Sequence, residues 1–513
     1  MDDHVKMGRY VVMVCIVAEL MILPEVSSMF YMMYAGASPS LSSCNNVAFD
    51  NSLEEKEVCT LYQEMGRENC TTPALKYQFK SVNVEWNYFC ESAKTIKNSI
   101  SVQMIGVLIG SVVFGQLSDS FGRRKGLLAT IIGMAVGWVV VARSSDIVQF
   151  TITRTVVGFF TGGSISVLNV FIMENIPKKH RMLINMVITW SPNMLPFAGL
   201  AWLTGDWRSL ALANAVVCIP GLLFCLVFIH ESPRWLIQRG RLDEAREIME
   251  KEHGTNKQGL VYESFDGVVK AEYELSLRAA TQKRRYSYYH LFYTPRLATT
   301  TIVLAFSFFS TSIVNYGILF NMEKLSGSIY LNSVYTGLMR YACNLAFGYA
   351  DLKYQRIGRK FVHTSGLVTI LISLSVVIVA YALDLNHALK DEIRVFILLA
   401  SSMTSQIYIS SGITGNELFP TPVRNLGYSF LQLWNRVGVV ISPFVFYSMD
   451  LWIALPYCIM TVFCLIDTLA FECLLPETKG KHLVEHMPGP DERFLRRRRN
   501  RAATEKQDGL VAA

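Results

Sequence analysis

Charged residues are scarce in this sequence. Only 17% of its 513 residues are Asp, Glu, Lys or Arg, while 51% are apolar, whereas a soluble domain is about 25% charged. This balance excludes a water-soluble, multidomain enzyme of the same length. No His-x-x-x-His, paired-carboxylate or Gly-x-Ser-x-Gly element stands where it would serve catalysis, and the nine histidines lie mostly in loops and tails. We therefore expect no enzyme, metal site or cofactor.

A continuous basic surface is also missing. The formal charge of +7 could point to nucleic acid, but the basic residues form short clusters between apolar runs and are not interleaved with aromatics on one face. Such clusters are typical of the cytoplasmic loops of membrane proteins. The partner that the charge pattern predicts is a lipid bilayer, not a nucleic acid.

Long apolar runs, by contrast, recur along the whole chain. Runs of about 18 residues or more cross the hydrocarbon core of a bilayer as helices. We expect twelve such helices, at residues 10–36, 99–119, 127–143, 147–173, 183–204, 209–229, 296–321, 328–350, 361–383, 393–416, 427–449 and 452–475. The first run is followed by small residues, as a cleaved signal peptide is, but it is far longer than the roughly 7–15 residues of a signal and contains Glu19, Pro24 and Glu25. It predicts a retained first helix.

Loop charges set the expected orientation. Alternating the loops places the basic clusters and both termini on one side, which the positive-inside rule assigns to the cytoplasm. The resulting divisions are an N-terminus with the first helix (1–36), an outer loop (37–98), the rest of a six-helix bundle (99–229), a cytoplasmic linker (230–295), a second six-helix bundle (296–475) and a basic tail (476–513). The linker contains a polar helical stretch, Arg241 to Glu252; it reads as a connector, with partner binding or phosphorylation as the alternative.

The outer loop carries the signs of an oxidising compartment. It holds Cys44, Cys59, Cys70 and Cys90, and a sequon at Asn69. Four cysteines predict two disulfides in one of three pairings, and the sequon predicts glycosylation if the loop is lumenal. The other seven cysteines fall in expected helices, where buried thiols are the usual state.

The two halves of the chain repeat each other. Glu174-x-x-Pro177-x-x-x-Arg181 recurs as Glu417-x-x-Pro420-x-x-x-Arg424, an offset of 243 (417 − 174). Gly122-Arg123 recurs as Gly358-Arg359, and Glu231-Ser232 recurs as Glu477-Thr478, at offsets of 236 (358 − 122) and 246 (477 − 231). A duplicated six-helix unit predicts an all-α membrane protein with twelve transmembrane helices in two pseudo-symmetric six-helix bundles, the major facilitator fold.

The segment from Gly115 to Lys125 resembles the signature loop of that superfamily. Gly115 would let another helix approach, Gly122 would permit a tight turn, and Asp119 would offer a carboxylate to nearby arginines. A basic topogenic loop is the plainer reading, but the repeat favours a latch that forms and breaks during transport. The candidate latch residues are Gly115, Asp119, Gly122, Arg123, Arg124, Arg154, Glu174, Arg181, Glu231, Arg234, Glu417 and Arg424.

Within the superfamily the chain resembles the organic cation, anion and carnitine transporters. The segments that carry this resemblance are Gly8-Arg9-Tyr10, Trp86-Asn-Tyr-Phe-Cys90, Glu231-Ser-Pro-Arg-Trp-Leu236, Leu291-Phe-Tyr-Thr-Pro-Arg296, Asn315-Tyr-Gly317, Ile329-Tyr-Leu331, Glu417-Leu-Phe-Pro-Thr-Pro-Val-Arg-Asn-Leu-Gly427 and Pro476-Glu-Thr-Lys-Gly480. The resemblance implies a plasma-membrane carrier of small organic ions. Three departures are the four loop cysteines where six are common, Asp351 seven residues before Gly358 instead of three, and Phe308 with Phe309 where relatives often have tryptophan.

Two arginines bear on the charge of the substrate. Arg340 and Arg436 fall near the middle of expected helices, where an arginine costs on the order of 2.5–3.5 kcal/mol unless it faces the bundle interior. The resemblance implies that Arg436 occupies a position that is acidic in cation carriers and arginine in anion and carnitine carriers. We therefore expect an organic anion, with a carnitine-like zwitterion second if Glu19 and Glu25 neutralise the arginines. Tyr316 and Asn344 are assigned to the same pathway.

Three other functions stay open. An organic cation carrier and a sugar carrier share parts of the pattern, although sugar carriers have a short first loop and a glutamine-rich cluster in the seventh helix. A membrane sensor that keeps the fold but moves nothing is also compatible with the sequence. The oligomeric state is left open.

Overall fold

The computed structural model describes residues 8–45, 47–49, 55–65, 73–90, 93–176, 184, 187–255, 267, 269–270, 273–274, 287–354, 357–479 and 487. Within this part of the chain, twelve α-helices have 15 residues or more, and each corresponds to one of the twelve predicted apolar runs. Nine of the helices described are long and apolar enough to cross a membrane. The prediction of an all-α membrane protein is therefore confirmed.

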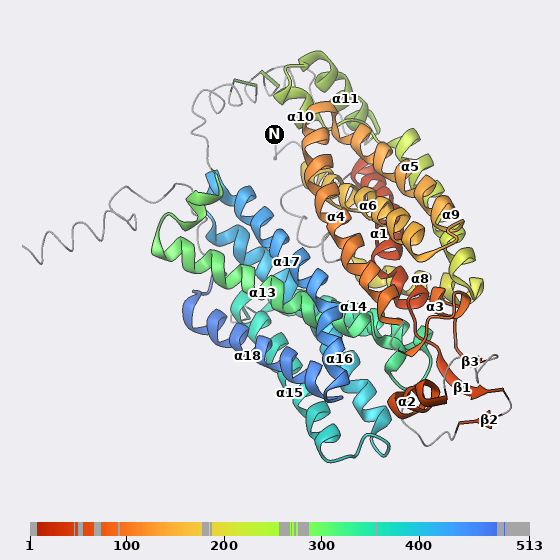
Figure 1. The fold of residues 1–513 in the computed structure, drawn as a ribbon. Helices are drawn as coiled ribbons and strands as arrows, with labels where there is room; N and C mark the ends of the chain where they lie inside the picture. The colour runs from red at the N-terminus through yellow and green to blue at the C-terminus, as the bar shows by residue number, and fades with distance from the viewer. Residues whose placement is uncertain are drawn as a thin grey trace, which may run out of the picture. The chain divides into compact units, whose positions relative to one another are not determined.

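The first half of the chain contributes six of the long helices. They are α1 (Arg9–Ala35), α4 (Ala93–Phe121), α5 (Arg123–Val141), α6 (Ile147–Asn175), α8 (Trp190–Thr204) and α9 (Trp207–Phe228). In Figure 1 these helices lie side by side, with α1 and α6 among the others. Buried aromatic rings fill the space between them: Tyr31 lies 4.8 Å from Trp138 between ring centroids, and its hydroxyl donates to the carbonyl oxygen of Trp207 at 2.6 Å.

Glycines allow α4 and α6 to approach closely. A Cβ on Gly110 would lie 1.8 Å from the carbonyl oxygen of Phe159, and one on Gly162 would lie 2.0 Å from that of Val107. Small residues let helix backbones approach in membranes, where dispersion contacts and not water drive association. At Gly115, where we expected this approach, a Cβ would meet only Ser166 Oγ at an ordinary 3.6 Å. That expectation was therefore placed one to two turns too far along α4.

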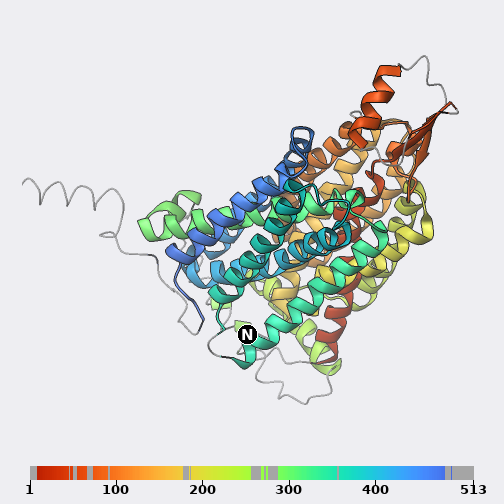
Figure 2. The ribbon, with the colours of Figure 1, turned by 90° about the horizontal axis from the view of Figure 1, so that it is seen from below.

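The segment between α1 and α4 forms a small cap at one end of this bundle. It contains β1 (Ser40–Cys44), β2 (Val47–Ala48), α2 (Glu55–Met65), β3 (Pro73–Lys76) and α3 (Val82–Glu85), with the strands in the antiparallel order β2-β1-β3. Figure 2 shows the strands and α2 projecting from the helices. Cys59 and Cys90 form a disulfide, and Cys44 is also disulfide-bonded. Cys70 and Asn69 lie outside the described residues.

The opposite end of α4 meets a short helical segment, α10 (Pro233–Gln238) and α11 (Leu242–Thr255). Trp235, Leu236 and Ile237 of α10 pack with Ala245 and Met249 of α11 in a small apolar core. The predicted helical stretch of the linker is thus α11. In Figure 1 this segment lies at the end of α4 and α5.

The second half contributes the other six long helices. They are α13 (Pro295–Leu319), α14 (Ile329–Lys353), α15 (Arg359–Ala382), α16 (Lys390–Leu418), α17 (Arg424–Tyr447) and α18 (Leu455–Leu474). Short 3-10 turns occur at η3 (Tyr288–Phe292), η4 (Met322–Lys324), η5 (Thr421–Val423) and η6 (Ser448–Asp450). Buried Leu304, Phe419, Leu431 and Phe471 form part of the core of this half.

The chain forms two compact units whose boundary does not follow the midpoint of the sequence. Unit 1 is Met1–Lys283 with Leu319–Tyr341, and unit 2 is Arg284–Ile318 with Ala342–Ala513. The end of α13, η4 and the first half of α14 thus belong to unit 1. There Lys97 Nζ donates to Asn321 Oδ1 and Glu323 Oε1, both at 2.7 Å, and Gln78 Oε1 accepts from the N–H of Ile329 at 2.8 Å.

Candidate functional site

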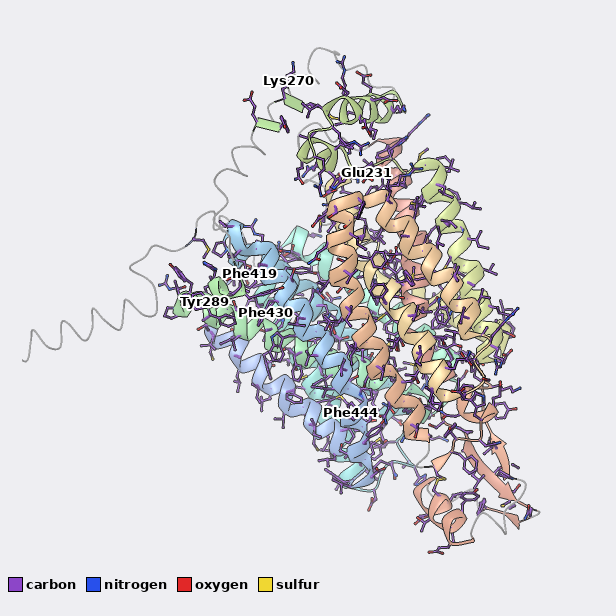
Figure 3. All side chains as sticks on the ribbon, turned by 45° about the horizontal axis from the view of Figure 1, so that its top comes forward. Glu231, Lys270, Tyr289, Phe419, Phe430 and Phe444 are labelled. Atoms are coloured by element: carbon purple, nitrogen blue, oxygen red, sulfur yellow. A yellow bond between two sulfur atoms is a disulfide. The ribbon has the colours of Figure 1, made fainter. Side chains whose placement is uncertain are left out.

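The turn between α4 and α5 holds the first of two carboxylate-capped clusters. Gly122 has a φ of 112°, and a Cβ there would lie 2.3 Å from Glu231 Oε2. Glycine therefore both permits the turn and lets the Glu231 carboxylate reach the start of α5. Glu231 Oε1 accepts from the backbone N–H groups of Arg123 at 2.7 Å and Arg124 at 3.2 Å. An anion at a helix N-terminus is favourable, so Glu231 caps α5. Figure 3 labels Glu231 among the side chains at this end of the helices.

The guanidinium of Arg123 connects three helices around this cap. Its Nη1 lies 2.6 Å from Asp119 Oδ1, and its Nη2 lies 3.0 Å from Glu174 Oε1. The Arg123 side chain is 7% exposed, while that of Asp119 is 70% exposed. The indole of Trp235 donates to the carbonyl oxygen of Asp119 at 2.8 Å, which joins α10 to the same cluster. We call Asp119, Gly122, Arg123, Glu174 and Glu231 the first latch.

A second cluster repeats this arrangement in the other half of the sequence. A Cβ on Gly358 would lie 2.2 Å from Glu477 Oε2. Glu477 accepts from the backbone N–H groups of Arg359 and Lys360, both at 3.1 Å, and so caps α15 as Glu231 caps α5. We call Asp351, Gly358, Arg359, Glu417 and Glu477 the second latch.

The second latch accommodates its longer turn with an extra lysine. Arg359 Nη1 lies 2.5 Å from Asp351 Oδ1, and its Nη2 lies 3.6 Å from Glu417 Oε1. Lys479 Nζ lies 3.1 Å from Asp351 Oδ1 and donates to three carbonyl oxygens of the turn at 2.7–3.0 Å. The longer spacing between Asp351 and Gly358 thus comes with a different set of contacts. Sequence reasoning missed Asp351, Glu477 and Lys479 as site residues, although the repeat had already paired Glu477 with Glu231.

The two capping carboxylates differ in acidity. Burial raises the pKa of Glu231 above its ordinary value, although hydrogen bonds from Ser232, Arg124 and Arg123 act against this shift. Burial would also raise the pKa of Glu477, but backbone hydrogen bonds, that of Lys479 first, outweigh it and lower the pKa. The ionised state is therefore more strongly favoured at Glu477 than at Glu231.

A buried polar centre lies inside unit 1, away from the first latch. Arg154 on α6 is 1% exposed, and its Nη2 donates to Gln103 Oε1 and, at 3.2 Å, to the carbonyl oxygen of Ser28. Its guanidinium lies 4.6 Å from the ring centroid of Tyr31 and 5.0 Å from that of Trp138. Among the described residues, Nε and Nη1 of Arg154 have no hydrogen-bond partner. The environment therefore stabilises the cation by two aromatic faces and two oxygen acceptors.

This placement corrects the assignment of Arg154 to the latch. Arg154 and Glu174 are 20 residues apart on α6 (174 − 154), so about 30 Å of helix separates them. The Arg-x-x-x-Gly pattern instead marks a packing site, because a Cβ on Gly158 would lie 2.8 Å from the carbonyl oxygen of Gln103.

Both acidic residues of α1 lie at helix contacts. Glu25 is 1% exposed and accepts from Ser164 Oγ of α6 at 2.6 Å. Glu19 Oε1 accepts from Asn193 Nδ2 of α8 at 2.7 Å. Glu25 is thus buried in the interior of unit 1, whereas Glu19 is half-buried at the contact between α1 and α8. The role of both carboxylates in a substrate pathway stays a prediction.

The remaining pathway residues divide between the units. Arg340 belongs to unit 1 and is 6% exposed, eleven residues after Ile329 on α14. Arg436 belongs to unit 2 and is 9% exposed, twelve residues after Arg424 on α17. Also in unit 2, Tyr316 is buried, and Asn344 Oδ1 accepts from Gln406 Nε2 at 2.5 Å. Both arginines are therefore buried near the middle of their helices.

The other candidate latch residues have separate contacts. Arg124 Nη2 donates to the carbonyl oxygen of Leu226 at 2.7 Å, and Arg424 Nε donates to that of Phe419 at 3.3 Å. Arg234 is half-buried in α10. Arg181 lies outside the described residues.

A membrane protein with twelve long helices in its described residues and a capped ion-pair cluster in each half of its sequence is a transporter of the major facilitator class. The chain belongs to the sugar (and other) transporter family, whose profile matches residues 26–488. This confirms the class inferred from the repeat and the latch motifs.

Curated relatives of the chain include an organic cation transporter and members of solute carrier family 22. It is 31% identical to an organic cation transporter protein of Drosophila melanogaster over 413 residues, which is 79% of this chain and 73% of the relative. It is 26% identical to solute carrier family 22 member 7 of Rattus norvegicus over 463 residues, 87% and 83% of the two chains. The resemblance to organic cation and anion transporters is thus confirmed, as is the expectation of a transporter and not an enzyme.

Solved structures support the same fold. The inward-open conformation of the xylose transporter XylE from E. coli is similar with a TM-score of 0.66 and 16% sequence identity, covering 93% of this chain and 98% of the other. A partially occluded inward-open conformation of XylE has a TM-score of 0.62 and 17% identity, covering 92% and 100%.

Proposed function

We propose that this transporter carries small organic anions, carboxylates or sulfates, across the plasma membrane by alternating access, with both termini in the cytoplasm. The observation that carries the proposal is the burial of Arg436, 9% exposed, near the middle of α17. An arginine at that depth favours the bundle interior over lipid. A guanidinium there offers paired hydrogen bonds to a planar or tetrahedral oxyanion.

A second buried cation supports a pathway of positive character, because Arg340 on α14 is 6% exposed. The carboxylates of buried Glu25 and half-buried Glu19 favour the second candidate, a carnitine-like zwitterion, whose ammonium they would attract.

In this proposal the latches control access to the site. Each joins helix ends of one half through an arginine held between carboxylates, and such clusters have two arrangements, formed and open. Asp119, Glu174 and Glu417 are the carboxylates that would exchange partners, because Glu231 and Glu477 are fixed at helix N-termini by backbone N–H groups. None of these residues needs to touch the substrate.

Uptake into proteoliposomes tests the substrate class. Phenyl sulfate, tetraethylammonium, carnitine and glucose serve as labelled probes for an anion, a cation, a zwitterion and a neutral solute. We expect phenyl sulfate to accumulate. Removing one partner of a buried charge pair costs roughly 3–5 kcal/mol, so Arg436→Ala is expected to reduce anion uptake by about two decades or more.

The control is Arg296→Ala, which removes an exposed arginine from the start of α13 and should leave uptake unchanged. Arg436→Lys keeps the charge but not the paired donors, and should restore part of the activity. Accumulation of tetraethylammonium by the wild type, unaffected by Arg436→Ala, contradicts the anion assignment. Accumulation of carnitine, reduced by both Arg436→Ala and Glu25→Gln, supports the zwitterion instead.

A further inference from the structure

Two ionisable side chains lie in the interior of unit 2, apart from the second latch and from Arg436. His363 on α15 and Asp467 on α18 both have side chains with 0% exposure, and His363 Nε2 lies 3.7 Å from Asp467 Oδ1. His363 is four residues from the start of α15, and Asp467 is seven residues from the end of α18. At 1.5 Å per residue the pair sits about 6–10 Å inside the end of the unit that holds Glu477.

The pair lacks the hydrogen bonds that a buried charge requires. Within the described residues, neither oxygen of Asp467 nor Nε2 of His363 has a hydrogen-bond partner. The other face of the site is weakly polar, because His363 Nδ1 lies 3.3 Å from Ser411 Oγ and 3.4 Å from Ser410 Oγ. The imidazole stacks on Phe471, with ring centroids 3.5 Å apart.

Among the described residues, no other charged side chain contacts His363 or Asp467. The polar groups around the pair are hydroxyls from α13 and α16 and a thiol from α18, namely Ser307, Ser410, Ser411 and Cys464. The charged residues nearer the helix ends are paired with each other: Lys360 Nζ lies 3.4 Å from Glu472 Oε1, and Arg359 contacts Glu417 at 3.6 Å.

A lone carboxylate in such surroundings is far less stable than a protonated or paired one. The pair is neutral overall when it holds one proton, either as carboxylic acid beside imidazole or as carboxylate beside imidazolium. Loss of that proton leaves an uncompensated anion, and gain of a second leaves an uncompensated cation. Both are disfavoured in the interior.

We propose that His363 and Asp467 form a proton-binding site that holds one proton and exchanges it with water at the end of unit 2 near Glu477. Ionisable groups within membrane helices commonly belong to ion or proton pathways. The site is separate from the substrate assignment, because it depends on neither the identity nor the charge of the solute. Each exchange moves one proton between water and the pair and requires no other reactant.

Proton binding by the folded protein has a definite effect on its stability. Above about pH 6.5, the ordinary pKa of histidine, the unfolded chain releases the histidine proton, so a folded site that keeps one proton, as proposed, binds more protons than the unfolded chain. The ratio of folded to unfolded protein therefore falls by up to tenfold per pH unit. Between about pH 4 and 6.5 the proposed folded site and the unfolded chain each hold one proton at these residues. The site then contributes nothing to the dependence of folding stability on pH.

The apparent melting temperature of the purified full-length protein, measured from pH 5 to 8.5 at one scan rate, tests the site without any transport substrate. We expect the wild type to lose stability above pH 6.5 relative to the double variant His363→Gln/Asp467→Asn. Asp467→Asn alone leaves a buried neutral imidazole, so this variant should lose stability, relative to the double variant, at pH values below 6.5. His363→Gln alone leaves a buried carboxylic acid, so stability falls with rising pH across the whole range.

The matched control is His387→Gln, which removes an exposed histidine from the same unit and should follow the wild-type curve. If the double variant does not fold, the two single variants still decide the test, because their melting temperatures should change with pH in opposite directions. Parallel curves for the wild type and the variants that fold would overturn the proposal. Failure of phenyl sulfate uptake, by contrast, would refute only the proposed substrate.

Discussion

Gly110→Ala is the substitution whose effect the structure defines most sharply. The added Cβ would lie 1.8 Å from the carbonyl oxygen of Phe159 and 2.6 Å from its carbonyl carbon, whereas ordinary contact begins near 3.4 Å. The obstacle is backbone, which cannot rotate away as a side chain does. The axes of α4 and α6 must therefore separate by more than 1 Å along a contact that also includes Gly162. Overpacking of a rigid contact costs about 3 kcal/mol or more, a shift of over a hundredfold in the folding equilibrium.

Thermal unfolding of detergent-solubilised protein, with size-exclusion chromatography of the same extract, measures this effect. We expect Gly110→Ala to lower the melting temperature strongly or to prevent recovery of monodisperse protein. Gly199→Ala is the matched control, because no atom lies within 4 Å of a Cβ at that position of α8. Alanine favours a helix over glycine by about 1 kcal/mol, so this control should melt at or slightly above the wild-type temperature. Equal melting temperatures for the two variants would refute the close approach of α4 and α6.

Three further predictions concern the latches and the outer loop. At neutral pH Glu477→Gln should destabilise the protein by about 1–2 kcal/mol, because two helix N–H groups lose an ionised acceptor. Glu231→Gln should destabilise it by less, because burial already disfavours the charge of Glu231. The stability that Glu477 contributes is lost as pH falls through its lowered pKa, and equal melting temperatures for the two variants would contradict this ranking. Asp119→Asn should reach the cell surface but transport poorly, as surface biotinylation and uptake can establish, whereas normal uptake argues against a latch role. Peptide N-glycosidase should shift the mobility of the wild type but not of Asn69→Gln, and an unshifted wild-type band from native tissue puts the proposed topology in question.

Helix positions and the repeat followed directly from the sequence because both depend on local pattern. An apolar run must satisfy its backbone hydrogen bonds within itself in lipid, so its length predicts a helix. The pairing of Glu231 with Glu477 was available from the repeat, because their offset of 246 (477 − 231) is close to the offset of 236 (358 − 122) between Gly122 and Gly358. The structure adds that each carboxylate caps the helix that begins directly after the paired glycine, α5 for Glu231 and α15 for Glu477.

Contacts between distant residues were not predictable in the same way. His363 looked like one histidine among nine, and Asp467 stands 104 residues later (467 − 363) in an apolar run, so nothing local connects them. Gly110 and Gly115 are both glycines in the same apolar run, so the sequence does not distinguish them. Only the structure shows that α4 approaches α6 at Gly110. Arg154 was grouped with the latch because the sequence motif does not show at which end of a helix a residue lies.

The unit boundaries at Lys283, Ile318 and Tyr341 affect experiments in which the protein is expressed as two separate fragments. A fragment that ends in the linker would lack residues 319–341, which complete unit 1. Lys97, 9% exposed, would lose both Glu323 and Asn321 and leave an ammonium group buried without an acceptor. Split versions of this transporter should therefore assemble better when the break falls after Tyr341, even though that cut passes through α14, than when it falls at the apparent centre of the duplicated sequence.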